Sequence, residues 1–299
     1  MIEVKNLTKH FDDIIAVDNI SASIKEGNVF GLIGSNGAGK STFLRMLSGV
    51  LRPDSGEITI DGQPVFENIA VKERFFFIPD KQYFFANTTP LGMMKYYKSV
   101  YKNFSTDRFH HMMNQFDLDE KRRIGTFSKG MKKQVSVICA MSAMTDYVFC
   151  DETFDGLDPV ARQAVKSLFA ADIADRGLTP VIASHNLREL EDICDHVGLL
   201  HKGGILFNKD LEDMKLGIHK IQCAWSEPLP EDSFKAFDIM SSSRRGNLYV
   251  LTVKGEKEDI SSRFAALNPV FFEMIPLSLE EIFISETEVL GYDVKKLIG

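Results

Sequence analysis

The sequence has few of the features that mark secreted, metal-binding and membrane-spanning chains. It contains four cysteines in 299 residues, and none forms a CxxC pair or has zinc-type spacing with histidine. We therefore expect Cys139, Cys150, Cys194 and Cys223 to be buried, reduced thiols of a cytosolic protein. No stretch approaches the roughly 20 apolar residues that cross a bilayer, and the first residues lack a signal-peptide pattern. These absences predict a chain that does not cross a membrane by itself.

An excess of basic charge is also missing. Lysine and arginine number 35 against 42 aspartates and glutamates, so the net charge is −7. A protein whose main task is to coat nucleic acid is normally basic, and the charge disfavours that class. Apolar residues make up 44% and charged residues 26%, a globular balance that excludes a disordered or collagen-like chain. At about 150 residues per domain, the length suggests about two domains.

The first two thirds of the chain alternate between strand-like and helix-like segments. Apolar and polar residues alternate as in short strands over 2–7 and 16–24, and a glycine-flanked apolar run predicts a buried strand over 29–33. Further strands are expected over 147–150, 179–183 and 197–200, and helices over 41–51, 159–174 and 187–194. This alternation favours an α/β fold with a mainly parallel sheet.

Two parts of the chain depart from this alternation. Residues from about 82 to 134 have a mostly helical pattern between two strand-like segments, which predicts a helical insert. Beyond about residue 216, strands are expected over 221–225, 248–253 and 271–275, and helices over 260–267 and 279–285. We therefore predict a first domain over 1–212 and a small C-terminal accessory α+β domain over 217–299.

A glycine-rich segment carries the clearest chemical signal. Residues 34–41 read Gly-Ser-Asn-Gly-Ala-Gly-Lys-Ser and match the phosphate-loop (Walker A) pattern in full, between a strand and a helix. Glycines let successive backbone N–H groups point at phosphate oxygens, and the helix N-terminus favours negative charge. Lys40 is expected at the β- and γ-phosphates and Ser41 on Mg²⁺. A glycine-rich turn that binds nothing is the alternative, which the complete pattern disfavours. The expected nucleotide contacts are Ser35, Asn36, Gly37, Ala38, Gly39, Lys40, Ser41 and Thr42.

Two carboxylates follow the expected strand over 147–150. In an open α/β sheet, ligands bind at the carboxyl ends of the strands, so Asp151 and Glu152 are expected beside the phosphate loop. Asp151 would hold Mg²⁺ through water, and Glu152 would accept a proton from the attacking water as general base. A solvated turn is the commoner explanation of an Asp-Glu pair alone, and the phosphate loop upstream favours the catalytic interpretation.

The motifs and their order resemble the nucleotide-binding subunit of ATP-binding cassette (ABC) transporters over about residues 1–212. Residues 127–131, Phe-Ser-Lys-Gly-Met, resemble the family signature Leu-Ser-Gly-Gly-Gln, with Ser128 and Gly130 at matching positions and Lys129 replacing a glycine. The resemblance implies a P-loop NTPase fold whose mainly parallel sheet carries an antiparallel β edge and a helical insert. It further implies that the helix after Ser128 points at the γ-phosphate bound by a second subunit. Taken alone, Ser128 indicates a helix N-cap.

The resemblance assigns two more residues to the catalytic end of the site. Residues 156–158, Gly-Leu-Asp, are similar to the D-loop, so that Asp158 contacts the nucleotide site across a dimer interface. His185 is similar to the switch histidine, which hydrogen-bonds the γ-phosphate and steadies the water and Glu152. A lone histidine at a strand end is more often structural, and its spacing from Glu152 carries the assignment.

Three further positions follow from the same resemblance. Phe11 stands where the family has an aromatic residue that stacks on adenine, and Val17 where a small apolar residue lines the ring. Asp80 stands where the family has a glutamine. A carboxylate there can reach Mg²⁺ through water but cannot donate the amide hydrogen bond.

The resemblance implies an ATPase that uses ATP and Mg²⁺ and works as a nucleotide-sandwich dimer with a second ATP-binding subunit, identical or different. Its other partner would be a separate integral membrane permease subunit, whose short helix contacts a few residues between 81 and 101. The chain would then lie peripherally at the cytoplasmic face of the cell membrane. Residues 278–284 resemble the extension of drug- and antibiotic-exporter type ATPases.

Two other classes of protein were weighed against this interpretation. Soluble ABC ATPases that act on DNA or ribosomes usually carry two cassettes or a long coiled coil, whereas this chain has one cassette, no heptad array and an acidic balance. A P-loop GTPase calls for Asn-Lys-x-Asp, and residues 208–211 read Asn-Lys-Asp-Leu. Neither a kinase nor a GTPase explains the signature-like segment, so a transport ATPase without nucleic acid as partner remains the prediction.

Overall fold

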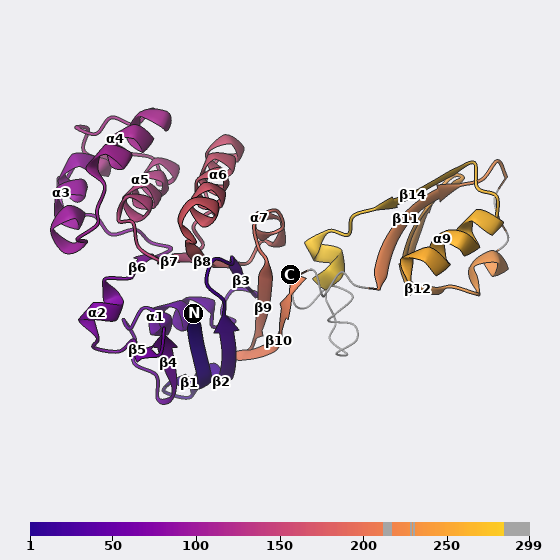
Figure 1. The fold of residues 1–299 in the computed structure, drawn as a ribbon, viewed down its shortest axis with the longest axis horizontal. Helices are drawn as coiled ribbons and strands as arrows, with labels where there is room; N and C mark the ends of the chain where they lie inside the picture. The colour runs from indigo at the N-terminus through magenta and orange to yellow at the C-terminus, as the bar shows by residue number, and fades with distance from the viewer. Residues whose placement is uncertain (212–216, 228, 230, 284–299) are drawn as a thin grey trace. The chain divides into compact units, whose positions relative to one another are not determined.

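The described residues form two units, residues 1–209 and the described part of 210–283 (Figure 1). The computed structural model describes residues 1–211, 217–227, 229 and 231–283. In this described part of the chain, no helix combines the length and apolar character needed to cross a bilayer.

A six-stranded sheet forms the centre of the first unit, in the order β10-β9-β3-β8-β7-β6. Its strands are β3 (Phe30–Ile33), β6 (Phe75–Ile78), β7 (Tyr147–Asp151), β8 (Thr179–Ser184), β9 (His196–His201) and β10 (Gly204–Asp210). The five strands from β9 to β6 run parallel. Every residue of β3, β7 and β8 is buried, as expected for a sheet covered on both faces. Because parallel strands end at one edge, the segments that follow them lie together.

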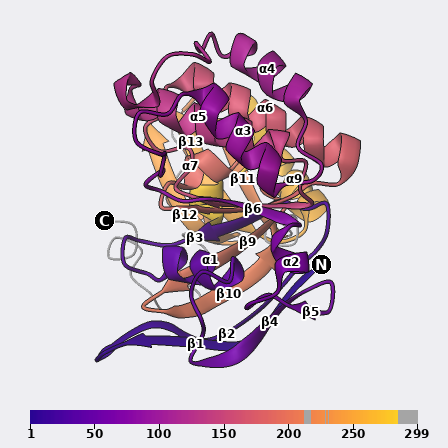
Figure 2. The ribbon, with the colours of Figure 1, turned by 90° about the vertical axis from the view of Figure 1, so that its left-hand side faces the viewer.

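A four-stranded antiparallel sheet, in the order β2-β1-β4-β5, forms the predicted β edge. Its strands are β1 (Ile2–Phe11), β2 (Ile14–Ile24), β4 (Ser55–Ile60) and β5 (Gln63–Pro64). Helix α1 (Lys40–Leu47) lies between the two sheets (Figure 2). Its Phe43 and Leu47 share one core with Leu7 of β1 and Val181 of β8. This packing fixes the start of α1, and with it the phosphate loop.

The helical elements of the first unit gather mainly in the insert. The insert contains α3 (Pro90–Val100), α4 (Thr106–Gln115), a 3₁₀ turn (Ile124–Thr126) and α5 (Lys129–Ser142), after the short α2 (Ile69–Lys72). Helix α6 (Pro159–Arg176) connects β7 to β8, and α7 (Leu187–Leu190) follows β8. The helix expected over 187–194 is wrong beyond Leu190. Residues 191–193 form a turn, and Asp195 beyond it accepts a hydrogen bond from the Val29 amide at 2.8 Å.

The second unit is a four-stranded antiparallel sheet in the order β12-β13-β11-β14, with one long helix. Its elements are β11 (Ile218–Ala224), a 3₁₀ turn (Glu231–Phe234), β12 (Asp238–Arg245), β13 (Leu248–Lys254), α9 (Lys257–Ala266) and β14 (Phe271–Ile275). Ile260 and Phe264 of α9 pack on Ile221 and Leu251 of the sheet. Strand β12 was not predicted, because its residues Ser-Ser-Ser-Arg-Arg do not alternate between apolar and polar. Residues 279–283 are helical, while 284 and 285 of that expected helix lie outside the described residues.

The fold is therefore the predicted one: an α/β, P-loop NTPase arrangement with a mainly parallel sheet, an antiparallel edge and a helical insert, plus a smaller α+β unit. All four cysteines are buried and free, as expected.

Candidate functional site

The phosphate loop lies between β3 and α1, and its conformation requires glycine. Gly37 and Gly39 have φ values of +81° and +106°, in the left-handed region. A Cβ atom on Gly39 would lie 2.3 Å from the carbonyl oxygen of Ala16. The loop therefore turns tightly against β2, and its backbone can wrap a phosphate as the motif predicts.

Lys40 is the first residue of α1, and its side chain reaches back across the phosphate loop. The side chain is buried, and its ammonium donates to the carbonyl oxygens of Gly34 at 2.7 Å and Ser35 at 3.1 Å. The same Nζ atom lies 3.4 Å from Oε1 of Glu152. This cation therefore stands between the loop backbone and a carboxylate, where it can pair with phosphate oxygens.

A pocket of about 270 Å³ opens in front of the loop. The loop and α1 contribute Asn36, Gly37, Gly39, Lys40, Ser41 and Thr42, the β2 segment contributes Ile14, Ile15 and Ala16, and Asp80 and Glu152 complete the lining. Ser35 and Ala38 are not among the lining residues. Instead they are joined by a hydrogen bond from the Ala38 amide to the Ser35 carbonyl at 3.1 Å. The pocket is thus polar beside Lys40 and apolar beside β2, which suits a phosphate chain carrying a base.

Ser41 and Asp151 bring two oxygen atoms together that could ligate a metal ion. The Ser41 hydroxyl donates to Oδ1 of Asp151 at 3.0 Å. Burial at the end of β7 raises the pKa of the Asp151 carboxyl, while the Ser41 hydrogen bond opposes that shift. A buried carboxylate beside a hydroxyl fits a hard cation such as Mg²⁺. Within the described residues no group of three or more His, Cys, Asp or Glu could hold a metal ion.

Glu152 sits at the centre of the catalytic cluster that the sequence predicts. Its carboxylate approaches Lys40 through Oε1, and its Oε2 lies 2.9 Å from Nδ1 of His185. The Glu152 backbone has φ +47°, which costs of order 1–3 kcal/mol for a residue with a side chain. Its amide donates to the carbonyl oxygen of Ala183 on β8 at 3.0 Å. The structure therefore brings Lys40, Glu152 and His185 together.

Lys133 of α5 also contacts this cluster, through Glu152, and was not predicted from the sequence. Its side chain is 0% exposed, and its ammonium donates to the carbonyl oxygen of Glu152. Nζ also lies 3.7 Å from Oδ1 of Asp80. Burial lowers the pKa of Lys133, and Asp155 and Asp80 oppose that shift. One feature of the sequence could have indicated this residue: Lys133 stands four residues before Val137 and so falls on the apolar face of the helix.

The signature segment (residues 127–131) packs against the D-loop (residues 156–158) of the same chain. Ser128 is the N-cap of α5 and accepts from the Met131 amide at 3.1 Å. A Cβ atom on Gly130 would lie 3.0 Å from the carbonyl oxygen of Gly156. Asp158 caps α6 and accepts from the Ala161 amide at 2.9 Å. None of these segments is part of the lining of the pocket in front of Lys40.

The two residues expected at the adenine ring lie in different environments. Phe11 is 45% exposed at the end of β1, opposite Ile14 of β2. Val17 is 0% exposed and belongs to the core between the sheets. The place of Val17 at the adenine ring stays a prediction; its side chain lies against the phosphate loop, with Cγ2 3.6 Å from where a Cβ on Gly39 would stand. Ile15 and Ala16, the preceding residues of β2, line the pocket.

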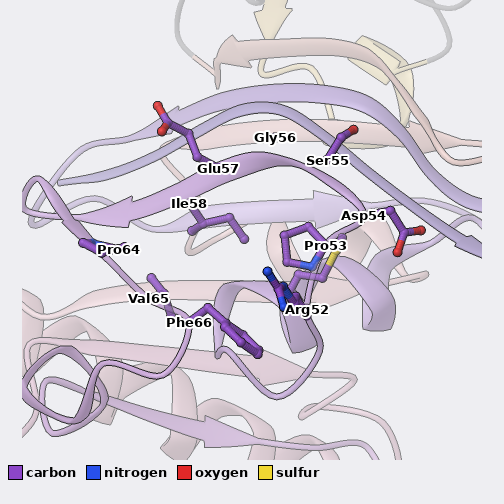
Figure 3. A pocket seen from close by; sticks show the side chains of 11 residues that line it. Arg52, Pro53, Asp54, Ser55, Gly56, Glu57, Ile58, Pro64, Val65 and Phe66 are labelled. Carbon is purple, nitrogen blue, oxygen red and sulfur yellow. The ribbon is translucent and has the colours of Figure 1, made fainter.

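A larger pocket, of about 600 Å³, lies along β4 away from these groups. Figure 3 shows its wall, where the Arg52 guanidinium lies 5.4 Å from the centre of the Phe66 ring. Asp54 at its rim is held by Lys9 at 2.6 Å and by the His10 amide at 2.7 Å. These hydrogen bonds lower the pKa of Asp54. The Asp54 carboxylate is thus tied to β1, and the residues predicted to bind the phosphates lie mainly at the smaller pocket.

Comparison with known proteins gives concordant matches. A family model described as "ABC transporter" matches residues 17–155. The ABC transporter ATP-binding protein YtrB of Bacillus subtilis is 29% identical over 286 residues, 96% of this chain and 98% of that protein. The bacitracin transport ATP-binding protein BcrA of Bacillus licheniformis is 31% identical over 219 residues, 72% of this chain and 71% of that protein.

Solved structures agree with these matches at the level of the fold. The ATP-binding subunit of an ABC transporter has a TM-score of 0.66 and 26% identity, with 72% of this chain and 92% of that chain covered. A dimeric ATP-binding cassette in a post-hydrolysis state with ADP and Pi has a TM-score of 0.64 and 20% identity, with 71% and 99% covered.

Proposed function

The chain belongs to the ABC transporter family as an ATP-binding subunit with ATPase activity, and from that premise we propose that it energises transport through a separate integral membrane permease. The observation that carries the proposal is the placement of Glu152 between Lys40 at 3.4 Å and His185 at 2.9 Å. The three side chains stand at the mouth of a phosphate loop, as hydrolysis of a terminal phosphate requires.

Binding of ATP assigns a role to each part of the pocket. Apart from the Ala38 amide, which donates to Ser35, the backbone N–H groups of residues 35–42 hold the phosphates, and Lys40 moves its contacts from loop carbonyls to the β- and γ-phosphate oxygens. Phe11, which lies outside the pocket lining and pairs with the lining residue Ile14, stacks on the adenine at the apolar end of the pocket. Stacking does not select strongly among bases, so the phosphates contribute most of the recognition.

Ser41 and Asp151 would hold Mg²⁺, with Asp80 reaching it through water. When bound, the ion neutralises charge on the phosphate oxygens. Glu152 accepts the proton of the attacking water, and the new O–P bond forms as the bond to the ADP oxygen breaks. His185 donates to Glu152 or to the γ-phosphate, according to its tautomer, and keeps the carboxylate aimed.

A second ATP-binding subunit completes the site. Ser128, Gly130 and Asp158 belong to segments outside the lining of this chain's own pocket, so we infer that they act on nucleotide bound by the second subunit. The N-terminus of α5, which is 14 residues long, would then direct its amides at that γ-phosphate. Closure on two nucleotides and opening after hydrolysis supply the motion.

An apolar surface beside the insert suits the permease. A pocket of about 390 Å³ contains Phe76, Tyr97 and Tyr101 in its wall, next to the exposed Val100. The neighbouring rings of Tyr83, Phe85 and Tyr96 are exposed, and Phe85 makes T-shaped contacts with each of the other two. An amphipathic helix of the permease can bury these rings. The chain would then sit peripherally on the cytoplasmic face of the membrane, with residues 1–212 as the cassette and residues 217–299 as an accessory domain.

Substitution of the general base tests this function. Glu152→Gln keeps the shape of the side chain and removes the proton acceptor, so Mg²⁺-dependent turnover should fall by about 10²–10⁴-fold while ATP binding survives. Unchanged turnover would show that Glu152 is not the base. Purification of the tagged chain from membranes should bring an integral membrane protein with it, and its repeated absence would argue against the permease. The likeness to exporter-type ATPases makes export the direction we propose.

A further inference from the structure

We propose that Lys133 is a positioning residue of the hydrolytic site, which clamps the backbone of Glu152 and has Asp80 as its counter-charge. The inference rests on the proposed role of Glu152 as general base. It assigns a function to a lysine of α5 that does not line the nucleotide pocket. It also gives a reason for an aspartate at position 80.

The first step concerns how Lys133 is buried. The side chain is 0% exposed, and the ammonium donates to the Glu152 carbonyl oxygen. A buried ammonium is costly unless it is both hydrogen-bonded and paired with a carboxylate. Asp80 provides that carboxylate, with 3.7 Å between Oδ1 and Nζ. The lysine therefore joins α5 both to the segment after β6 and to the segment after β7.

The second step concerns what the hydrogen bond holds in place. Glu152 adopts φ +47°, a left-handed conformation that persists when surrounding contacts enforce it. The Glu152 amide donates to Ala183 at 3.0 Å, and the Glu152 carbonyl oxygen accepts from Lys133 and from the Asp155 amide at 3.3 Å. The residue is thus fixed on both sides, which sets the direction of its carboxylate toward Lys40 and His185.

The third step explains why an acid stands at position 80. Asp155 is the other nearby carboxylate, and its Oδ2 atom pairs with Lys129 at 2.7 Å. A neutral amide at position 80 would leave the ammonium of Lys133 with no carboxylate neighbour other than Asp155, which is already paired with Lys129, and Glu152. The Asp80 and Lys133 charges are therefore coupled, and the effect of changing one should depend on the other.

The test is a double-mutant cycle on the full chain, with ATP turnover and nucleotide binding measured separately. Lys133→Met should lower kcat about tenfold and change KM for ATP less than about twofold, because it affects aim and not affinity. Asp80→Asn should lower kcat by a smaller factor. The double variant should lose less than the product of the two single effects, because both charges leave together. Lys132→Met, one residue earlier on the same helix, is the matched control and should keep wild-type turnover.

A second substitution covers the case in which Lys133→Met does not fold. Lys133→Gln keeps a donor for the Glu152 carbonyl and loses the charge. When it is combined with Asp80→Asn, kcat should therefore be higher than in Lys133→Gln alone. The proposal is overturned if Lys133→Met retains kcat within about twofold of wild type, or if the two single effects multiply. A wild-type chain with no turnover contradicts the proposed function instead, and the two failures are therefore distinguishable.

Discussion

Nδ1 of His185, at the end of β8, lies 2.9 Å from Oε2 of Glu152, at the end of β7. The His185 amide also faces that oxygen, at 3.4 Å. Neighbouring parallel strands therefore deliver the histidine and the acid to one point. The hydrogen bond fixes the Glu152 carboxylate while Lys40 approaches its other oxygen.

His185→Ala should lower ATP turnover about 10²-fold with little loss of nucleotide binding, because the carboxylate loses the group that aims it. Turnover of saturating Mg-ATP and binding of a fluorescent ATP analogue measure the two effects. His111→Ala, an exposed histidine of the insert, is the control and should behave as wild type. Equal turnover in the two variants would contradict the role of His185.

Asp151→Asn should raise thermal stability at neutral pH while it abolishes Mg²⁺-dependent turnover. Burial raises the pKa of Asp151 above its unfolded value. The folded chain therefore binds this proton more tightly than the unfolded chain does, and stability falls as pH rises through the raised pKa. The amide removes that buried charge, so Tm should increase by about 2–4 °C at pH 7, and the gain should shrink at pH 4. Calorimetry without Mg²⁺ measures it, and a lower Tm at pH 7 would contradict it.

Asp172→Asn should destabilise the chain by about 1–3 kcal/mol, because it leaves two partly exposed guanidinium groups without their buried carboxylate. Asp172 is a buried residue of α6 that pairs with Arg108 of the insert and with Arg176 at 2.8 Å. Urea unfolding measures the loss. Asp175→Asn, an exposed position on the same helix, should change stability by less than about 0.5 kcal/mol. Similar losses in the two variants would show that the buried pairing contributes nothing specific.

Local pattern was enough to predict the loop, most strands of the parallel sheet, and the position of Asp151 and Glu152 beside the loop. The phosphate loop needs glycine at fixed positions, and a fully buried strand such as Tyr147–Asp151 reads as an apolar run. The sequence could not show that Ile14 and Ile15 of β2 line the pocket, and the place of Val17 at the ring stays a prediction for a side chain that is buried. Lys133 escaped for a similar reason, because its partner Asp80 lies 53 residues away by sequence number and meets it through tertiary packing.

Phe11→Ala should weaken ATP binding by about 1–3 kcal/mol, the range of one aromatic stack on a base, with little effect on folding. The ring is 45% exposed, so its removal leaves no cavity. Val17→Ala should show the opposite pattern, since it removes buried methyl groups and costs stability with little change in affinity. Isothermal titration and thermal unfolding of both variants separate the two roles. Equal affinity in Phe11→Ala and wild type would exclude the stack.

Phe85→Asp should prevent co-purification with the membrane partner and leave the basal ATPase of the isolated chain intact. Phe85 is exposed and lies at the centre of a ring cluster, 6.0 Å from Tyr83 and 4.9 Å from Tyr96 between ring centres. A carboxylate there places an unpaired charge in the surface that the permease would bury. Val270→Asp, an exposed valine of the second unit, is the control. If both variants retain the partner, the docking surface lies elsewhere; if both lose it, the effect follows from added charge and not from the position of Phe85.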